Sequence, residues 1–205
     1  YITKQLMSKT LYLIRHGQAK HNELFLKIGS SAFYGDENID TKLTEEGHQQ
    51  SNDLGETWLN KNEIELVITS VQSRCLQTTM NIFRDTEIPI KALECLREYP
   101  LGSHTCNKRS DKSLLESIYQ RVNFDDLIYE KDKLWRPDRT ETIEELDERI
   151  ELFKEYLKSI PQTKIAVVSH SGFIGRYKDQ YIRYIENGDT ELKHCYPYEI
   201  EFNQD

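Results

Sequence analysis

Short apolar runs that alternate with helical patterns constrain the fold of this chain more than any other feature. Strands are expected at residues 11–14, 65–69 and 164–169, and shorter ones near 89–92 and 198–202. Helical spacing is expected over residues 44–60, 73–83, 142–158 and 173–185. This alternation favours a mostly parallel central sheet with helices on both faces, which is a three-layer α/β/α sandwich.

The three principal strands lead into basic side chains. Residues 11–14 precede Arg15, His16 and Gly17, the helix after the second strand carries Arg74, and the third strand precedes His170. Ligands bind at the carboxyl ends of the strands in open α/β sheets. An imidazole beside a guanidinium suits a phosphate ester, because Arg binds two phosphate oxygens and its charge favours the neutral, nucleophilic imidazole. For the Arg-His-Gly tripeptide alone, a histidine that merely caps the turn is an equally good interpretation.

Separated motifs, in order along the chain, resemble those of the histidine phosphatase superfamily, also called the phosphoglycerate mutase-like superfamily. The residues that carry the resemblance are Arg15, His16, Gly17 and Asn22; Leu43, Thr44, Gly47 and Gln50; Thr69, Ser70, Arg74, Gln77 and Thr78; Glu98; and His170. Any one motif alone would be weak, but together they are specific. The chain departs from the family where Gln18-Ala19 replaces Glu-Ser and Val71-Gln72 replaces Pro-Leu. Neither departure removes a catalytic group.

The resemblance implies a phosphohistidine mechanism with five catalytic residues. His16 would be the nucleophile, Arg15, Arg74 and His170 would stabilise the phosphoryl oxygens, and Glu98 would be the general acid. A purely structural role is the alternative for three of them: a surface ion pair for Arg74, a strand-end histidine for His170, and an ion pair between Glu98 and the neighbouring Arg97.

Four further residues are candidates for substrate binding. Asn22 would add a neutral donor, and Ser171 follows His170 directly. Lys108 and Arg109 lie in the least patterned region, residues 99–140, which we expect to form an insertion that folds over the sheet edge as a lid. A basic pair in a loop is ordinarily solvated, yet a lid over an anionic substrate needs such cations. Three of the histidines outside the motifs are interpreted as structural: His21, His48 and His194.

Length, charge and residue spacing argue against several classes of protein and of catalytic site. A chain of 205 residues suits a single domain over residues 1–205, with residues 1–10 as an extension. The net charge of -8 and the lack of a long basic cluster argue against nucleic acid, and no apolar run reaches the length of a membrane span. The sequence predicts neither a metal site nor a cysteine-based phosphatase, because the histidines lack ligand spacing and no Cys precedes an Arg by six positions. Cys75, Cys95, Cys106 and Cys195 form no C-x-x-C pair, which favours free thiols and a cytoplasmic location.

Three functions follow, in order of preference. The first is a metal-independent phosphatase of small phosphorylated metabolites that needs no cofactor. The second is a phosphoglycerate mutase dependent on 2,3-bisphosphoglycerate, although the chain lacks the RHYG stretch and the Arg-Arg pair that glycolytic mutases of the family carry. The third is a non-catalytic protein that binds phosphorylated ligands. The expected partner is a small phosphorylated substrate, and the sequence is compatible with a homo-oligomer.

Overall fold

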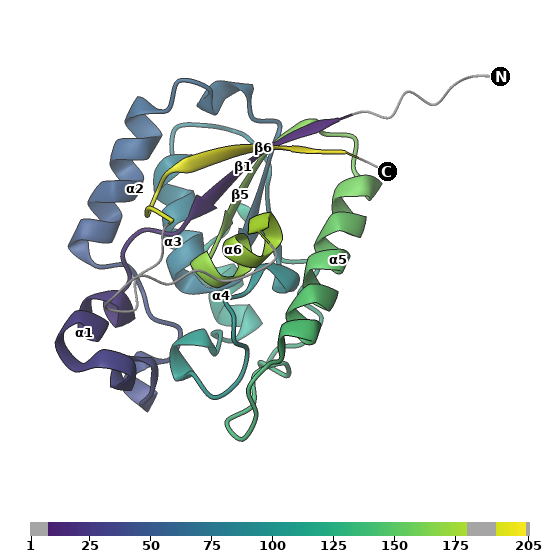
Figure 1. The fold of residues 1–205 in the computed structure, drawn as a ribbon. Helices are drawn as coiled ribbons and strands as arrows, with labels where there is room; N and C mark the ends of the chain where they lie inside the picture. Colours follow the sequence, from purple (N-terminus) through teal and green to yellow (C-terminus); the bar gives the residue numbers. More distant parts are fainter. Residues whose placement is uncertain (1–7, 180–191, 204–205) are drawn as a thin grey trace.

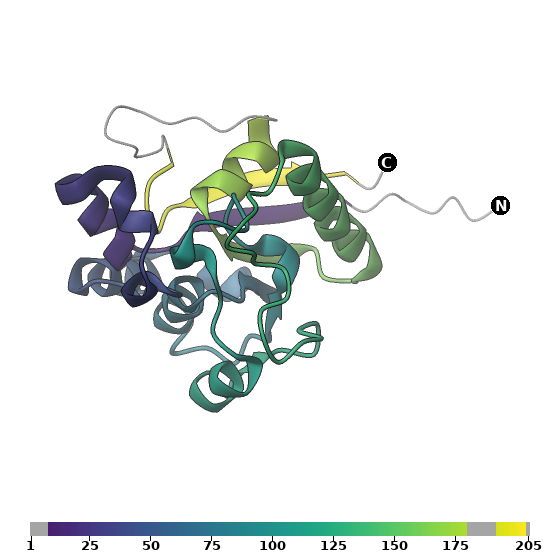
Figure 2. The ribbon, with the colours of Figure 1, turned by 90° about the horizontal axis from the view of Figure 1, so that it is seen from below.

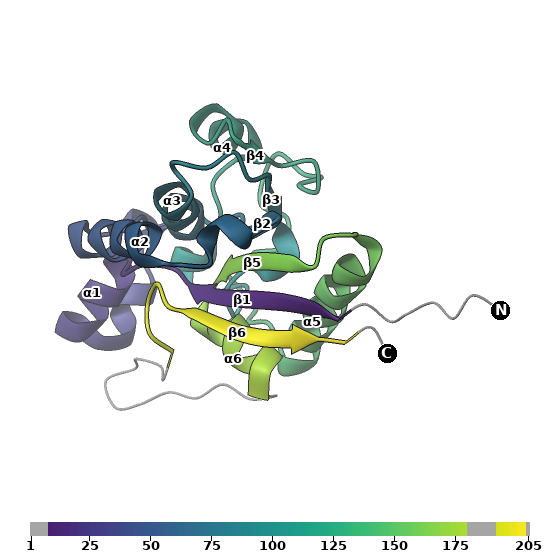
Figure 3. The same ribbon diagram turned by 90° about the horizontal axis from the view of Figure 1, so that it is seen from above.

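A computed structural model describes residues 8–179 and 192–203 of the chain. In this part, a six-stranded sheet has the order β4-β3-β2-β5-β1-β6. The strands are β1 (Lys9–Arg15), β2 (Leu66–Ser70), β3 (Ile90–Leu93), β4 (Val122–Asn123), β5 (Lys164–Ser169) and β6 (Pro197–Phe202). Every neighbouring pair is parallel except β1 and β6, which run antiparallel (Figure 3). The predicted mostly parallel sheet is confirmed.

Helices cover both faces of the sheet. The described helices are α1 (Lys20–Ile28), α2 (Glu45–Thr57), α3 (Ser73–Ile82), α4 (Lys112–Ile118), α5 (Ile143–Ser159) and α6 (Ser171–Asp179). Figure 1 shows α2 and α5 on opposite sides of the strands. Because side chains alternate along β1, Tyr12 and Ile14 join the core beneath α2 and α3, whereas Leu11 and Leu13 join the core beneath α5 and α6. The three-layer sandwich is therefore present as predicted.

Local capping explains where the two longest helices begin. Thr44 precedes α2 and accepts a hydrogen bond from the Gly47 amide through its side chain. Thr142 precedes α5 and forms a reciprocal capping box with Glu145. These caps leave α2 and α5 starting one residue later than the sequence pattern predicts, at Glu45 and Ile143.

Among the described α-helices and strands, the sequence pattern misses α1, α4 and β4. The strand β4 has two residues, too few to show an alternating pattern, and it pairs in parallel with β3. Part of the 99–140 insertion thus belongs to the sheet. Figure 2 shows α1 beyond one end of the strands. The predicted helix 173–185 is observed as α6 as far as Asp179, and the rest of the predicted range lies outside the described residues, as do residues 1–7 of the expected extension.

No helix in the described ranges is long and apolar enough to cross a membrane.

Candidate active site

His16 lies directly beyond β1, and its imidazole is 1% exposed. Its Nδ1 lies 2.6 Å from the Gly17 carbonyl oxygen, which can only accept, so Nδ1 carries the hydrogen and Nε2 keeps its lone pair. Burial, followed by the positive charge of Arg74, holds the pKa of His16 well below its usual value. The ring is thus neutral at physiological pH, with an unprotonated nitrogen available for attack.

Close backbone packing fixes the turn that follows His16. A Cβ on Gly17 would lie 2.4 Å from the Gly47 carbonyl oxygen, and a Cβ on Gly47 would lie 2.1 Å from that of Gln18. Only glycine permits this approach at either position. The glycines of two distant motifs therefore serve the same contact, which locks the His16 turn against the start of α2.

His170 and Arg74 lie beside His16. The rings of His16 and His170 are in edge contact, with centroids 5.2 Å apart, which the parallel register of β1 and β5 makes possible. His170 Nε2 lies 2.9 Å from the Ser70 hydroxyl, and burial is the main cause that keeps its pKa well below normal. Arg74, fully buried at the start of α3, donates to the Cys106 carbonyl and to the Asn107 side chain.

Glu98 is positioned by backbone donors. Its Oε1 accepts hydrogen bonds from the amides of Tyr99, at 2.8 Å, and Gly172, at 3.0 Å. A Cβ on Gly172 would lie 2.5 Å from that oxygen, so the contact requires glycine. Burial raises the pKa of Glu98, against the opposing effect of the Arg74 charge. A buried carboxyl with one oxygen held by amides can keep a proton on the other, Oε2.

These groups adjoin a cavity of about 250 Å³. Arg15, Asn22, Glu98 and Ser171 line it, whereas His16, Arg74 and His170 are almost fully buried and are not among its described lining residues. Asn22 also accepts a hydrogen bond from the Ala19 amide, which fixes the first turn of α1. In the described part of the chain, no group of three or more His, Cys, Asp or Glu side chains is arranged to hold a metal ion.

The structure places Lys108 and Arg109 elsewhere, which corrects the expectation that they reach the substrate. Neither residue lines the cavity. Lys108 Nζ lies over the Trp135 ring, 5.0 Å from its centroid. The Arg109 guanidinium is buried and binds Glu94 together with the carbonyls of residues 110 and 129–131. Its charge is used to hold the insertion together.

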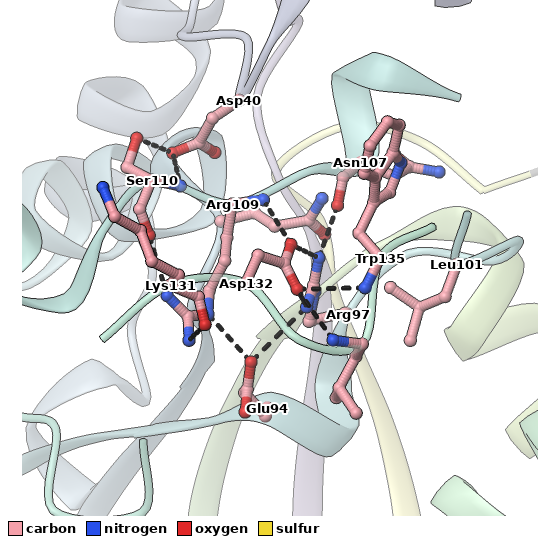
Figure 4. A network of polar contacts seen from close by, with 12 residues as sticks. Asp40, Glu94, Arg97, Leu101, Asn107, Arg109, Ser110, Lys131, Asp132 and Trp135 are labelled. Atoms are coloured by element: carbon pink, nitrogen blue, oxygen red, sulfur yellow. Dashed lines mark hydrogen bonds and ion pairs between the residues drawn. The ribbon is translucent and has the colours of Figure 1, made fainter. Parts of the chain in front are cut away.

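Buried ion pairs hold this insertion against Arg97 and Glu94 (Figure 4). Arg97 donates to both carboxylate oxygens of Asp132, at 2.9 and 2.6 Å, and to the Asn107 carbonyl at 2.7 Å. Asn107 in turn accepts from Arg74. Arg97 therefore does not form the ion pair with Glu98 that the sequence left open. The network instead joins Arg97, which precedes Glu98 in the chain, to Asn107 in the cavity lining.

Several residues that the motifs do not single out also shape the site. His194, interpreted as structural, donates to the His16 carbonyl oxygen, with its Nδ1 at 2.5 Å. His21 lines the cavity and bonds Thr41, whereas His48 bonds Asn81. Gln72 accepts from the Glu98 amide through its side-chain oxygen. The replacement of the family's Pro-Leu by Val71-Gln72 was the one sequence feature that could have drawn attention to Gln72. No sequence feature indicates that His194 contacts His16.

Comparisons with known proteins agree with this geometry. Residues 11–192 match the model of the histidine phosphatase superfamily, branch 1. Phosphoglycerate mutase-like protein 1 of Arabidopsis thaliana is 33% identical over 198 residues, which cover 81% of this chain and 69% of that protein. A second Arabidopsis phosphoglycerate mutase-like protein is 29% identical, with 81% and 72% covered.

Solved structures show the same fold. The α-ribazole phosphatase of Shigella flexneri has a TM-score of 0.56 at 24% identity and covers 80% of this chain and 75% of its own. A mycobacterial glucosyl-3-phosphoglycerate phosphatase has a TM-score of 0.54 at 22% identity, with 84% and 78% covered. From the extent of the family match, the chain belongs to branch 1 of the histidine phosphatase superfamily.

Proposed function

We propose that this protein is a phosphatase that hydrolyses small phosphomonoesters through a phosphohistidine on His16, without a metal or another cofactor. The observation that carries the proposal is the hydrogen bond from His16 Nδ1 to the Gly17 carbonyl, which leaves Nε2 unprotonated on a ring whose pKa is held low by burial. A neutral imidazole with a fixed tautomer is the form that attacks phosphorus.

The phosphoryl group requires donors, and the site supplies buried ones. Arg74 Nε and Gln72 Nε2 are buried and have no hydrogen-bond partner among the described residues. Such groups are rare in folded proteins, and a bound anion would satisfy them. Arg15, Arg74 and His170 would stabilise the charge on the equatorial oxygens as His16 attacks in line.

Glu98 completes both chemical steps. In the first, the bond from His16 Nε2 to phosphorus forms, the ester bond breaks, and protonated Glu98 transfers its proton to the departing alkoxide. In the second, the Glu98 carboxylate takes a proton from water as the water oxygen attacks phosphorus and the bond to His16 breaks. Phosphate leaves, and both residues return to their starting states. The raised pKa of Glu98 suits this exchange.

A phosphoglycerate mutase is the second candidate, because the two Arabidopsis relatives are named phosphoglycerate mutase-like proteins. A mutase retains a doubly phosphorylated intermediate and excludes water until it has turned round. The described cavity lining includes no lysine, and Arg15 is its one arginine. The second phosphate would therefore meet little positive charge, which favours hydrolysis.

A coupled assay with 3-phosphoglycerate, with and without 2,3-bisphosphoglycerate, distinguishes the two candidates. We expect phosphate release to exceed formation of 2-phosphoglycerate under both conditions. Mutase turnover far above phosphate release would overturn the phosphatase assignment. A parallel screen of sugar phosphates, nucleotides and phosphopeptides measures the breadth of hydrolysis. If wild-type protein releases phosphate from none of these esters, the proposal fails.

A further inference from the structure

Apart from Arg15, Asn22, Glu98 and Ser171, the described lining of the cavity consists mainly of rings. Its ring-bearing residues other than His21 are Phe25, Phe33, Tyr99, Pro100 and His104. They come from α1, from the turn that follows it, and from the chain on either side of residue 102. These five residues form a wall of rings, against which the organic group of a bound phosphate ester would lie.

Three of these rings form one stack. Phe33 lies between Phe25, at 5.2 Å and 20° between planes, and His104, at 5.0 Å and 23°. Burial lowers the pKa of His104, so its ring is neutral at physiological pH. Stacked neutral rings offer flat apolar faces and edges that favour contact with a further planar ring.

Charge supports the same interpretation. Among the described residues that line the cavity, Arg15 is the one side chain with a permanent positive charge, and the proposed chemistry uses it for the phosphoryl group. Lys108 lies over Trp135, and Arg109 binds Glu94. A carboxylate or second phosphate on the organic group would lose its hydration on binding and would find no cationic partner among the described residues of this wall. That loss of hydration weakens binding.

The position of Glu98 links the wall to the reaction. If Glu98 protonates the leaving oxygen, the carbon attached to that oxygen lies next to the residues that follow Glu98 in the chain. These are Tyr99 and Pro100, both in the cavity lining. The size also fits, because an apolar cavity of about 150 Å³ holds a benzene ring. The observed cavity of about 250 Å³ leaves room for one ring and a phosphoryl group.

We infer that the preferred substrates are phosphomonoesters whose leaving group carries a single planar apolar ring and no second anionic group. The inference rests on the proposed phosphatase function and names its substrate class. The stacked wall of Phe25, Phe33 and His104 selects for the ring, and the scarcity of cations in the described lining selects against a second charge.

The test uses three primary alkyl esters, so that leaving-group reactivity differs little: 2-phenylethyl phosphate, 2-cyclohexylethyl phosphate and 3-phosphoglycerate. We expect kcat/KM to be highest for the phenylethyl ester, by about 3- to 10-fold over the cyclohexyl ester, which is the range of aromatic pair energies. 3-Phosphoglycerate should be the poorest of the three. Faster hydrolysis of 3-phosphoglycerate than of the phenylethyl ester would overturn the inference while leaving the phosphatase function intact.

A variant pair locates the preference. Phe33→Leu should reduce the ratio of phenylethyl to cyclohexyl kcat/KM toward one. Tyr34→Leu is the matched control, because Tyr34 contacts the His104 ring at 5.2 Å but is 46% exposed and does not line the cavity. An unchanged ratio in Phe33→Leu, or an equal loss in Tyr34→Leu, contradicts the role of the stacked wall. Phosphate release from esters of the broader screen but from none of these three would also overturn the inference alone, whereas release from no ester at all would contradict the proposed function.

Discussion

The sheet edge and the 99–140 insertion build the two halves of the site in different ways. At the sheet edge, His16 and His170 follow directly from buried parallel strands, and Arg74 lies in the first turn of the helix after another. In the insertion, Asn107 and the chain around it are held by Arg97 and Asp132, a buried ion pair that joins residues 35 positions apart. The proposed phosphoryl chemistry thus rests on regular structure, and the part of the site that the insertion supplies rests on buried charge.

The two regions are therefore sensitive to different kinds of substitution. Strand burial spreads the stability of the sheet edge over many apolar contacts, so no single polar residue supports it. The insertion depends on a few ion pairs, and removal of one partner leaves the other charge buried and unpaired. Substitutions at the sheet edge should therefore change chemistry, and substitutions in the insertion network should change stability first.

The largest effect tests the junction of the two regions, at Glu98. In Glu98→Gln, no proton reaches the leaving oxygen, so we expect kcat for alkyl phosphates to fall by about 10²- to 10⁴-fold. The fall for p-nitrophenyl phosphate should be much smaller, because that leaving group needs little protonation. Steady-state kinetics on both esters measure the difference. Equal losses would reject the role of Glu98 as general acid.

A large effect on stability is expected in the insertion. Asp132→Asn leaves the buried Arg97 guanidinium without its anionic partner and should lower the free energy of unfolding by about 3–5 kcal/mol. Asp126→Asn is the matched control, because Asp126 pairs with Lys91 at 3.1 Å on the surface and should cost at most about 1 kcal/mol. Urea denaturation measures both. Similar midpoints for the two variants would show that the insertion does not depend on this buried ion pair.

An intermediate effect is the pH dependence of stability. Burial is the main cause that lowers the pKa of His16, His21 and His170 in the folded state, so below pH 6.5 the unfolded chain binds protons that the folded chain does not. Stability should therefore fall with pH below 6.5, by up to about 1.4 kcal/mol per pH unit for each such proton. The raised pKa of Glu98 acts in the opposite direction, since its folded-state proton stabilises the fold and that contribution is lost as pH rises through its pKa.

The variant His21→Gln isolates the histidine contribution. It should reduce the slope of unfolding free energy against pH between pH 5 and about pH 6.5, where unfolded histidines gain protons. Denaturant titrations at a series of pH values supply the slopes. The same slope in the variant and in wild type would show that His21 does not resist protonation in the folded state.

The smallest effect is expected at Lys108. Because its ammonium lies over the Trp135 ring and outside the cavity lining, Lys108→Ala should change KM by less than about twofold and stability by about 1 kcal/mol or less. Steady-state kinetics with a small anionic phosphomonoester test this. A tenfold rise in KM would indicate that Lys108 contributes to substrate binding, and it would weaken the distinction between the two regions.

The same contrast explains how much of the molecule the sequence predicts. Strands β1, β2 and β5 are predicted within a residue or two, because burial on both faces leaves a continuous apolar run. The predicted strand ends bring His16 and His170 to the same edge of the sheet, so the sequence alone indicates that they belong to one site. Periodicity and burial act locally, so they are visible in a window of a few residues.

The insertion follows no such local rule. Arg97 lies next to Glu98 in the sequence, yet it pairs with Asp132, and no periodic pattern connects these positions. His194 lies beside His16 because its backbone bridges to Arg15 at the end of β1. Arg109 carries the positive charge expected of a lid, but its guanidinium binds buried carbonyls and Glu94. Long-range polar pairing decides these positions, and the sequence shows the charges without their partners.

The most direct test of the account is the identity of the phosphorylated residue. Rapid-quench mass spectrometry during turnover should find an acid-labile, base-stable phosphate on His16 in wild-type protein. The phosphoenzyme should be absent in His16→Ala and retained in His48→Ala, whose histidine bonds Asn81 outside the cavity. Phosphate on His170, or turnover with no phosphoenzyme at all, would contradict the central claim that the fixed tautomer of His16 makes it the nucleophile.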